Sequence, residues 1–532
     1  MQSSRVRATP RPWRTGPAIA LLCVVAVVAS FFVGLGRAPL FDVDEGAFSQ
    51  ATLEMFQRHD FLATTLNGQP RYDKPILVYW LQAASVVALG ADEFALRLPS
   101  ALCACLWALF TFLFARRFLG VPRALLAAVL LATSLGVYII GRAATADALL
   151  NCLIAASMFA AYLHLHTGAR KWLYLTHAAI GLGFMAKGPV AVLIPLAVTL
   201  WFCWLRRDLR TWARAVFDWR GLALFAVIAL PWYVVILARD GWAFVEGFFL
   251  KHNVNRFGGT LQGHAGSLVY YFPVLIAWTM PYTALLVVAL RRIRTVWHDD
   301  LQLYLLLWFA FVFVFFSLSG TKLPHYLLYG ITGPTLLMAA YAPELRSRFW
   351  ALLPCLLFFA LLLALPQVLR LLLEPEVGGA LLPKPPDAYY REALGEIGAH
   401  FGRWAYALCG LGGLVAVAGL LLRRVPLVAA LAGAGTVGTL ALSLVVVPAA
   451  GAVLQGPIKE AAQVSRQLGV EPLMWRLNAP SFSVYRGAPT PSREPAPGDV
   501  IITKAKRLAE LPGYGYELLY SKYGIVLVRI KA

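Results

Sequence analysis

The sequence is poor in charge and lacks the motifs of nucleotide-dependent enzymes. Only 14% of its 532 residues are Asp, Glu, Lys or Arg, and 60% are hydrophobic. Soluble domains carry about 25% charged residues. No glycine-rich phosphate loop is present, which argues against a reaction that consumes a nucleotide. The composition therefore predicts a polytopic membrane protein.

Other classes of protein are excluded by how cysteine and charge are distributed. The net charge of +20 comes from short clusters between apolar runs rather than from a basic face or tail, so nucleic acid is not an expected partner. The first apolar run is too long for a cleavable signal and should remain as a membrane helix. No metal-ligand spacing with His occurs among the seven cysteines, which all fall in apolar runs and are predicted to be packing residues: Cys23, Cys103, Cys105, Cys152, Cys203, Cys355 and Cys409.

Apolar runs and the charges between them predict the membrane topology. The N-terminus carries Arg5, Arg7, Arg11 and Arg14 without an acid, which places it in the cytoplasm. The run 76–90 is short, and counting it as a span would send the later Arg clusters outside, so we predict an interfacial or re-entrant helix there. We predict about 13 transmembrane helices, at residues 15–36, 98–115, 124–141, 148–165, 172–186, 189–205, 221–238, 267–290, 301–319, 323–342, 349–369, 404–422 and 425–450.

The hydropathy changes after residue 450. Short apolar runs at 500–502 and 524–528 are typical of strands, and a helical pattern covers 458–468. We predict a mainly α transmembrane domain at 1–450 and a small C-terminal α/β domain at 451–532. The small domain should lie on the extracytoplasmic face and act as a lid or docking element.

Polar clusters gather in the loops predicted on that same face, at 37–97, 142–147, 239–266 and 320–326. Carboxylates there can act as general bases, and cations can hold phosphate. A single charge at a helix end is more often a solvated anchor, and Arg71 and Lys251 have the alternative role of contacting lipid headgroups. Together the clusters favour lipid-phosphate chemistry or transport.

Several short motifs occur in order between residues 37 and about 340. They are Asp44-Glu45-Gly46, Asn67-Gly68, Tyr72-Asp73-Lys74-Pro75, Phe94-Ala95-Leu96-Arg97-Leu98-Pro99-Ser100, Ala186-Lys187-Gly188-Pro189, His252-Asn253 with Arg256-Phe257, and Lys322-Leu323-Pro324-x-Tyr326. In these motifs the sequence resembles the bacterial polyprenyl-phosphate-sugar glycosyltransferases of the GT-C fold, which include protein O-mannosyltransferases and the aminoarabinose transferases that modify lipid A.

The resemblance implies roles for individual residues. Asp44, with Glu45 beside it, matches the catalytic acid of the first outer loop, and Asp147 matches a second acid that positions the acceptor or the catalytic acid. The residues implied to bind the donor phosphate are Lys74, Arg256, Lys322, Tyr72 and Tyr326.

The resemblance also bears on cofactors. It implies no required cofactor but leaves open a divalent metal held by Asp73 and His252. The sequence departs here from the aminoarabinose transferases, which have Glu at the position of Asp73 and Glu-His where this chain has His252-Asn253.

The expected activity follows from this resemblance. It is inverting transfer of a sugar from a polyprenyl (undecaprenyl) phosphate to an envelope acceptor such as lipid A, at the periplasmic face of the bacterial inner membrane. One alternative is transfer to Ser or Thr of a protein. A flippase or transporter of lipid-linked sugars is the alternative of another class, but its charges should lie near the bilayer midplane in repeated halves, and the sequence has no internal repeat.

Overall fold

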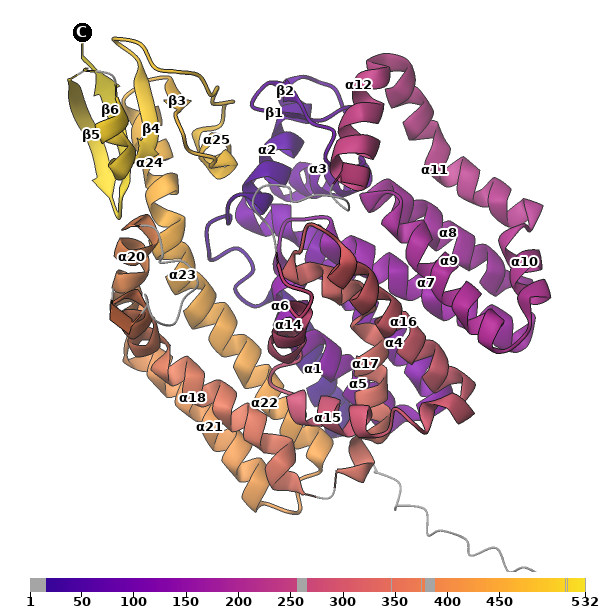
Figure 1. Ribbon diagram of the computed structural model, residues 1–532. Coiled ribbons are helices and arrows are strands. Elements are labelled where there is room, and N and C mark those ends of the chain that lie inside the picture. Colours follow the sequence, from indigo (N-terminus) through magenta and orange to yellow (C-terminus); the bar gives the residue numbers. More distant parts are fainter. Residues whose placement is uncertain are drawn as a thin grey trace, which may run out of the picture.

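The computed structural model describes residues 16–255, 266–345, 347–374, 376–377, 388–511, 513 and 515–531, without the side chains of 252–254 and 388. The N-terminal half is a helical bundle with one small hairpin (Figure 1). Its elements are α1 (Pro17–Phe32), α2 (Asp44–Gln57), β1 (Thr65–Leu66), β2 (Gln69–Pro70), α3 (Leu77–Leu89), α4 (Glu93–Leu119), α5 (Val121–Thr133), α6 (Leu135–Arg142), α7 (Asp147–Thr167), α8 (Arg170–Lys187), α9 (Val190–Leu205), α10 (Leu209–Val216), α11 (Trp219–Asp240), α12 (Trp242–Phe244) and the π-helix η1 (Val245–Val254).

The second half adds further helices and then a sheet. Its helical elements are α14 (Tyr271–Trp278), α15 (Thr283–Arg291), η2 (Val296–His298), α16 (Asp300–Leu318), η3 (Pro324–Gly330), α17 (Thr332–Tyr341), η4 (Ala342–Glu344), α18 (Arg348–Leu373), α20 (Ala388–Gly395), η5 (Glu396–His400), α21 (Arg403–Leu421), α22 (Leu427–Ala441), η6 (Leu442–Val446) and α23 (Val447–Leu454).

The chain is a multi-pass membrane protein. In the described residues, seven helices are long and apolar enough to cross a bilayer, or nine if each of two bent pairs counts as one span. The helices α1, α3 and α9 are apolar but shorter. Because α1 and α9, which were predicted to span, fall in the same class as α3, both the prediction that 76–90 does not span and the total of 13 spans stay predictions.

Three predicted helices are not continuous. The run 124–141 is divided at Ser134 into α5 and α6, which lie at 64° to each other. The run 267–290 is broken into α14 and α15, which lie at 118° to each other, because Pro281 has no N–H with which to continue the helix. The run 323–342 begins as the 3-10 helix η3. There, side chains take the carbonyls that an α-helix would use: Tyr271 OH donates to Leu323 O at 3.0 Å, and Trp278 Nε1 donates to Pro324 O at 2.8 Å.

The C-terminal residues form a four-stranded sheet with two helices, α24 (Gly456–Gln467) and α25 (Pro480–Arg486). The sheet order is β3 (Pro472–Met474), β4 (Val500–Lys504), β6 (Ile525–Ile530) and β5 (Tyr516–Lys522), with β3 and β4 parallel and the other pairs antiparallel. The strands predicted near 500–502 and 524–528 are therefore present. In Figure 1, α25 lies between this sheet and α2.

Small residues allow close helix packing beside the bundle. An ideal Cβ on Gly412 of α21 would lie 2.0 Å from Cε1 of Phe359, a fully buried ring of α18. The neighbouring Gly413 faces open space, with nothing within 4 Å of its Cβ position. Comparing substitutions at the two positions therefore distinguishes the close packing at Gly412 from the general effect of replacing a glycine in a helix.

Substitution of these glycines tests the α18–α21 contact. We expect Gly412→Ala to destabilise the protein by about 1–3 kcal/mol, because the added methyl overpacks a filled site. Gly413→Ala should be neutral or stabilise by up to about 1 kcal/mol, since alanine favours the helix more than glycine does. The thermal midpoint of the detergent-solubilised variants measures both effects, and equal midpoints would contradict the packing.

Candidate active site

The first turn of α2 presents two acids in different directions. Asp44 and Glu45 begin this helix, where the helix dipole favours negative charge. Consecutive residues point about 100° apart around an α-helix. Glu45 is accordingly buried, while Asp44 is exposed to a cavity.

Glu45 forms a buried ion pair with Arg97 of α4. Arg97 Nε donates to Glu45 Oε1 at 2.8 Å, and its Nη2 donates to Oε2 at 2.7 Å. The backbone N–H groups of Phe41 and Ala144 donate to the same carboxylate at 2.8 and 2.7 Å. Burial alone would raise the pKa of Glu45, but the Arg97 charge and these hydrogen bonds hold it below its usual range. Glu45 is therefore an ionised structural anchor.

Asp147, at the start of α7, is held in a second buried cluster. Its Oδ1 accepts from Lys187 Nζ at 2.5 Å and from Tyr329 OH at 2.8 Å. Lys187 also donates to Tyr329 OH at 2.6 Å, and His325 Nε2 lies 3.8 Å from Asp147 Oδ1. These ionic contacts and hydrogen bonds connect α7, α8 and η3.

Two cavities meet at these acids. One, of about 390 Å³, has a mostly apolar surface that includes Leu35, Tyr138 and Ile140, although Arg97 and Arg142 also line it. The other, of about 790 Å³, is polar. Both cavities share the wall residues Asp44, Thr145, Asp147 and His325.

Four cations line the polar cavity: Arg71, Lys74, Lys187 and Lys251. Arg71 is largely buried, with its guanidinium 5.3 Å from the centroid of the Phe48 ring and its Nε donating to Tyr79 OH at 3.2 Å. Burial lowers the pKa of Arg71, but Tyr79, Asp73 and Asp44 raise it overall. The arrangement can neutralise an anionic ligand beside Asp44.

Asp42 lies two residues before Asp44 and is bound by the C-terminal sheet unit. Its Oδ1 accepts from the backbone N–H of Ser481 at 2.9 Å, and its Oδ2 accepts from Ser481 Oγ. Burial raises the pKa of the Asp42 carboxyl to about 7, against the opposing hydrogen bonds from Ser481.

The predicted phosphate ligands divide into two groups. Lys74 and Tyr326 line the polar cavity, with Lys74 Nζ also donating to Asp73 O at 2.8 Å. Lys322 does not line it: the side chain is buried, and its Nζ donates to Ser319 O at 2.7 Å. Tyr72 is also outside the lining, because it packs against Phe244 and hydrogen-bonds Asp240. Arg256 lies outside the described residues.

The described residues do not assemble a metal site. Asp73 lines the polar cavity, but its carboxylate lies 3.3 Å from Arg71 Nη2. The side chain of His252 lies outside the description. Within the described part of the chain, no group of three His, Cys, Asp or Glu side chains is placed to hold a metal ion.

Three basic residues have roles that sequence analysis did not assign. Arg71 was expected to have the alternative of contacting lipid headgroups, and Arg97 and Lys187 were noted only within motifs. Each is buried against a carboxylate: Asp73, Glu45 and Asp147 respectively. Arg97 and Lys187 are each the single basic residue within a motif, which is the only sign of their importance in the sequence. For both, the carboxylate partner lies at least 40 residues away and could not be identified from the sequence.

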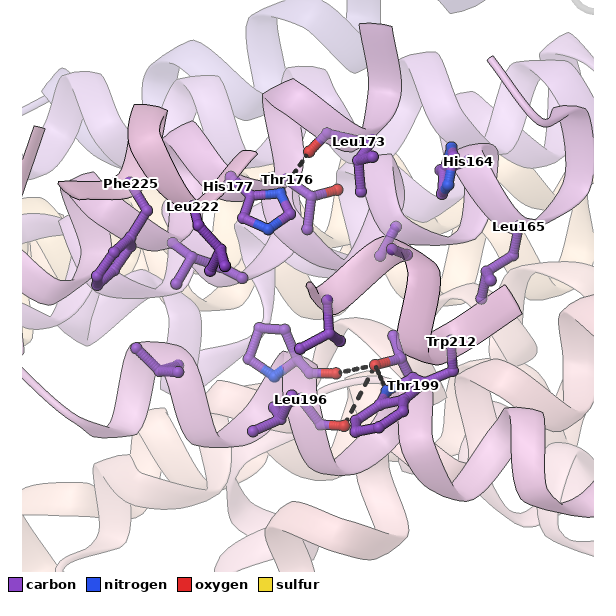
Figure 2. A pocket seen from close by; sticks show the side chains of 16 residues that line it. His164, Leu165, Leu173, Thr176, His177, Leu196, Thr199, Trp212, Leu222 and Phe225 are labelled. Carbon is purple, nitrogen blue, oxygen red and sulfur yellow. Dashed lines mark hydrogen bonds between the residues drawn. The ribbon is translucent and has the colours of Figure 1, made fainter. Parts of the chain in front are cut away.

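A separate cavity, of about 170 Å³, lies among α7 to α11 (Figure 2). Its lining contains no acid, lysine or arginine, all of its lining residues being described. Several polar atoms of its lining already bind other groups: His177 Nδ1 lies 3.0 Å from Leu173 O, and Trp212 Nε1 donates to Thr199 Oγ1 at 3.2 Å. The cavity has no cationic lysine or arginine that could bind a phosphate.

Known proteins share both the fold and parts of the sequence. A crystal structure of ArnT from Cupriavidus metallidurans bound to undecaprenyl phosphate superposes with a TM-score of 0.81 and 20% identity, covering 96% of this chain and 97% of that one. An apo oligosaccharyltransferase from Archaeoglobus fulgidus gives 0.51 and 11% identity, covering 93% of this chain and 70% of the other. The chain therefore has the GT-C membrane fold.

Sequence comparison shows which glycosyltransferases this chain is similar to. The family model for dolichyl-phosphate-mannose-protein mannosyltransferase matches residues 73–234. Undecaprenyl phosphate-alpha-4-amino-4-deoxy-L-arabinose arabinosyl transferases are 32% identical over 322 residues in Pseudomonas aeruginosa UCBPP-PA14 and 29% over 380 in Serratia proteamaculans. These cover 58% and 69% of this chain, but only 56% and 66% of the relatives. The predicted resemblance to polyprenyl-phosphate-sugar glycosyltransferases is confirmed.

The Glu45–Arg97 pair can be tested by separating charge from packing. Arg97→Met should destabilise the protein by about 3–5 kcal/mol, because it leaves Glu45 buried without its partner. The double variant Glu45→Leu/Arg97→Met should recover part of this loss by removing the orphaned charge. Thermal midpoints of the detergent-solubilised proteins give the comparison.

An exposed pair serves as the control. Arg493 and Asp499 are 2.7 Å apart at the surface of the C-terminal unit, so Arg493→Met should change stability by no more than about 1 kcal/mol. A double variant less stable than Arg97→Met alone would contradict the assignment of Glu45 as the charge that Arg97 compensates.

Proposed function

We propose that this protein is an inverting glycosyltransferase that moves a sugar from a polyprenyl phosphate to a lipid acceptor such as lipid A. The observation that carries the proposal is the meeting of a cation-lined cavity and a largely apolar cavity at Asp44 and Asp147. The aminoarabinose transferases to which the chain is similar support this substrate class.

The donor phosphate would bind in the cationic cavity. Arg71, Lys74 and Lys251 offer positive charge along its wall, and Lys187 contributes from the Asp147 cluster. When the bond between the sugar's anomeric carbon and the phosphate oxygen breaks, the phosphate gains negative charge. Fixed cations stabilise that charge more in the transition state than in the ground state, which accelerates the reaction.

Asp44 would act as the general base. It reaches both cavities, so it can take a proton from an acceptor hydroxyl or phosphate while that oxygen forms the new bond to the anomeric carbon. The polyprenyl phosphate leaves with the bonding electron pair from the opposite side. A single displacement inverts the anomeric centre, because no carboxylate nucleophile is needed.

Asp147 would position the centre rather than take the proton. Its Oδ1 already accepts hydrogen bonds from Lys187 and Tyr329. In this arrangement Asp147 aims the Lys187 ammonium at the junction of the cavities. No step requires a metal.

The proposed location is the bacterial inner membrane, with the site and the C-terminal unit on the periplasmic face and the N-terminus in the cytoplasm. Away from the site, basic loops contact one another: Arg206 pairs with Asp300 at 2.5 Å, and Arg348 Nη2 donates to Val425 O at 2.6 Å. Basic residues collect on the cytoplasmic side of membrane proteins, which supports this orientation.

Mass spectrometry of envelope lipids and glycoproteins from cells with and without the gene tests the proposal. Loss of a sugar mass from lipid A or another glycolipid is the expected result. Loss of glycopeptides with unchanged lipids would instead indicate transfer to protein. Cytoplasmic accumulation of polyprenyl-phosphate sugar, with neither product affected, would favour a flippase.

The role of Asp44 predicts the effect of its amide. Asp44→Asn should lower the transfer rate by about 10²–10⁴-fold, the usual contribution of a general base, because the amide cannot accept the proton. Donor affinity and expression should stay near wild type, since the side chain keeps its size. Glu517→Gln, an exposed change on β5, is the control, and wild-type turnover by Asp44→Asn would remove Asp44 from the mechanism.

The role of Lys74 predicts a loss of donor binding. Lys74→Ala should weaken donor affinity by about 10- to 100-fold, the value of a charged hydrogen bond of about 1.5–3 kcal/mol. Lys74→Arg should retain part of it. Binding is measured on the purified protein in nanodiscs. The control is Lys171→Ala, which changes an exposed lysine at the start of α8. Equal donor affinities of Lys74→Ala and wild type would contradict the assignment of Lys74 to phosphate binding.

A further inference from the structure

The short helix α25 of the C-terminal unit packs against α2, whose first turn carries Asp44. Ser481, Phe482 and Ser483 of this helix are fully buried. From α25, Ser481 donates two hydrogen bonds to Asp42, one from its backbone N–H and one from Oγ. Asp42 is two residues from Asp44, so this contact acts on the segment that carries the proposed base.

The fit between α25 and α2 leaves no space. An ideal Cβ on Gly46 would lie 2.5 Å from the Ser481 nitrogen, 3.0 Å from its Cα and 2.1 Å from Asp42 Oδ1. Only glycine at position 46 lets the start of α25 rest directly on the first turn of α2. The contact is therefore built into both elements.

Two more contacts bracket the segment on either side. Tyr485 OH accepts from the backbone N–H of Leu40 at 2.6 Å and donates to Glu93 Oε1 at 3.1 Å. Beyond α2, the Asn67 side-chain oxygen accepts from Ser483 Oγ at 2.7 Å and from the Thr490 N–H at 3.1 Å. The C-terminal unit thus holds the chain before, at and after the turn that begins α2.

The same unit reaches the cavity. Asn478, two residues before α25, lines the polar cavity together with Asp44, Lys74 and Lys187. Its amide can both donate and accept hydrogen bonds, which suits sugar hydroxyl groups beside the phosphate. The C-terminal unit therefore supplies a wall of the site as well as a support for it.

We propose that α25 is a positioning element of the active centre: Ser481 fixes Asp44 through Asp42, and Asn478 completes the cavity wall. This inference rests on the proposed function. The inference gives the C-terminal unit a part in catalysis instead of the role of a separate lid or docking element. Loss of its contacts with Asp42 would free the first turn of α2, which carries Asp44.

The variant Ser481→Ala tests the positioning. It removes the Oγ bond and keeps the backbone N–H bond, so the fold should persist. We expect kcat to fall by about 10- to 100-fold with an unchanged donor KM, because misplacing a catalytic group by about 1 Å costs about 100-fold in rate. Ser521→Ala, on exposed β5 of the same unit, should match wild type in kcat.

A cycle of variants tests whether Ser481 acts through Asp42. Asp42→Asn and the double variant Asp42→Asn/Ser481→Ala complete the cycle with Ser481→Ala. Two residues that act through one contact should give a double variant little slower than the slower single one, whereas independent residues multiply their losses. Multiplied losses would overturn the coupling.

Hydrogen–deuterium exchange of the wild type and Ser481→Ala gives a readout that does not depend on transfer. Exchange should rise in the peptide that covers 40–48, where the N–H groups of Glu45 and Ala47 report on the first turn of α2, with no change in α7. Failure of the wild type to transfer sugar would refute the proposed function without altering this result. Unchanged exchange with unchanged kcat would refute the role of Ser481.

Discussion

The buried ion pair between Glu45 and Arg97 is the constraint on which the site depends. Arg97 donates not only to Glu45 but also to the carbonyls of Leu35, Ala38 and Pro39. Glu45 in turn accepts the backbone N–H of Ala144. One guanidinium and one carboxylate thereby join α4, the loop after α1, the start of α2 and the segment before α7. Breaking a buried ion pair by removing one partner strongly destabilises a protein. The pair therefore fixes α2, which carries Asp44, relative to α7, which carries Asp147.

Sequence analysis predicted residues that share one cavity, but it did not predict the contacts that hold them. Asp44, Lys74 and Asp147, which were selected from their motifs, line the same polar cavity, and their roles in transfer stay predictions. The roles of Arg97 and Lys187 depend on carboxylate partners that are distant in the sequence, 52 positions away for Arg97 and 40 for Lys187. For Lys322, the motif position did not reveal that its ammonium donates to the nearby carbonyl of Ser319, and its role in phosphate binding stays a prediction.

The fold shows the same division. Apolar runs located the helices, because burial in a bilayer requires about 20 apolar residues per span, and β-rich runs located β4 and β6. Hydropathy did not reveal the break at Pro281 or the 3-10 turn after Pro324, because both depend on which side chains compete for backbone carbonyls. The run 323–342 divides into η3 and α17, and the hydrogen bonds from the Trp278 indole and the Tyr271 hydroxyl at its start could not be predicted from hydropathy.

Five acids line the two cavities: Asp42, Asp44, Glu45, Asp73 and Asp147. Asp42 accepts hydrogen bonds from Ser481, and Asp73 lies beside Arg71. Glu45 is held by Arg97, and Asp147 by Lys187 and Tyr329. Asp44 is exposed to both cavities. A carboxylate locked in a buried ion pair is a weak proton acceptor, because protonation would leave its cation uncompensated. In the proposed mechanism, the ion pairs of Glu45 and Asp147 leave Asp44 as the base, and the rigid surroundings would keep Asp44 at the junction where donor and acceptor would meet.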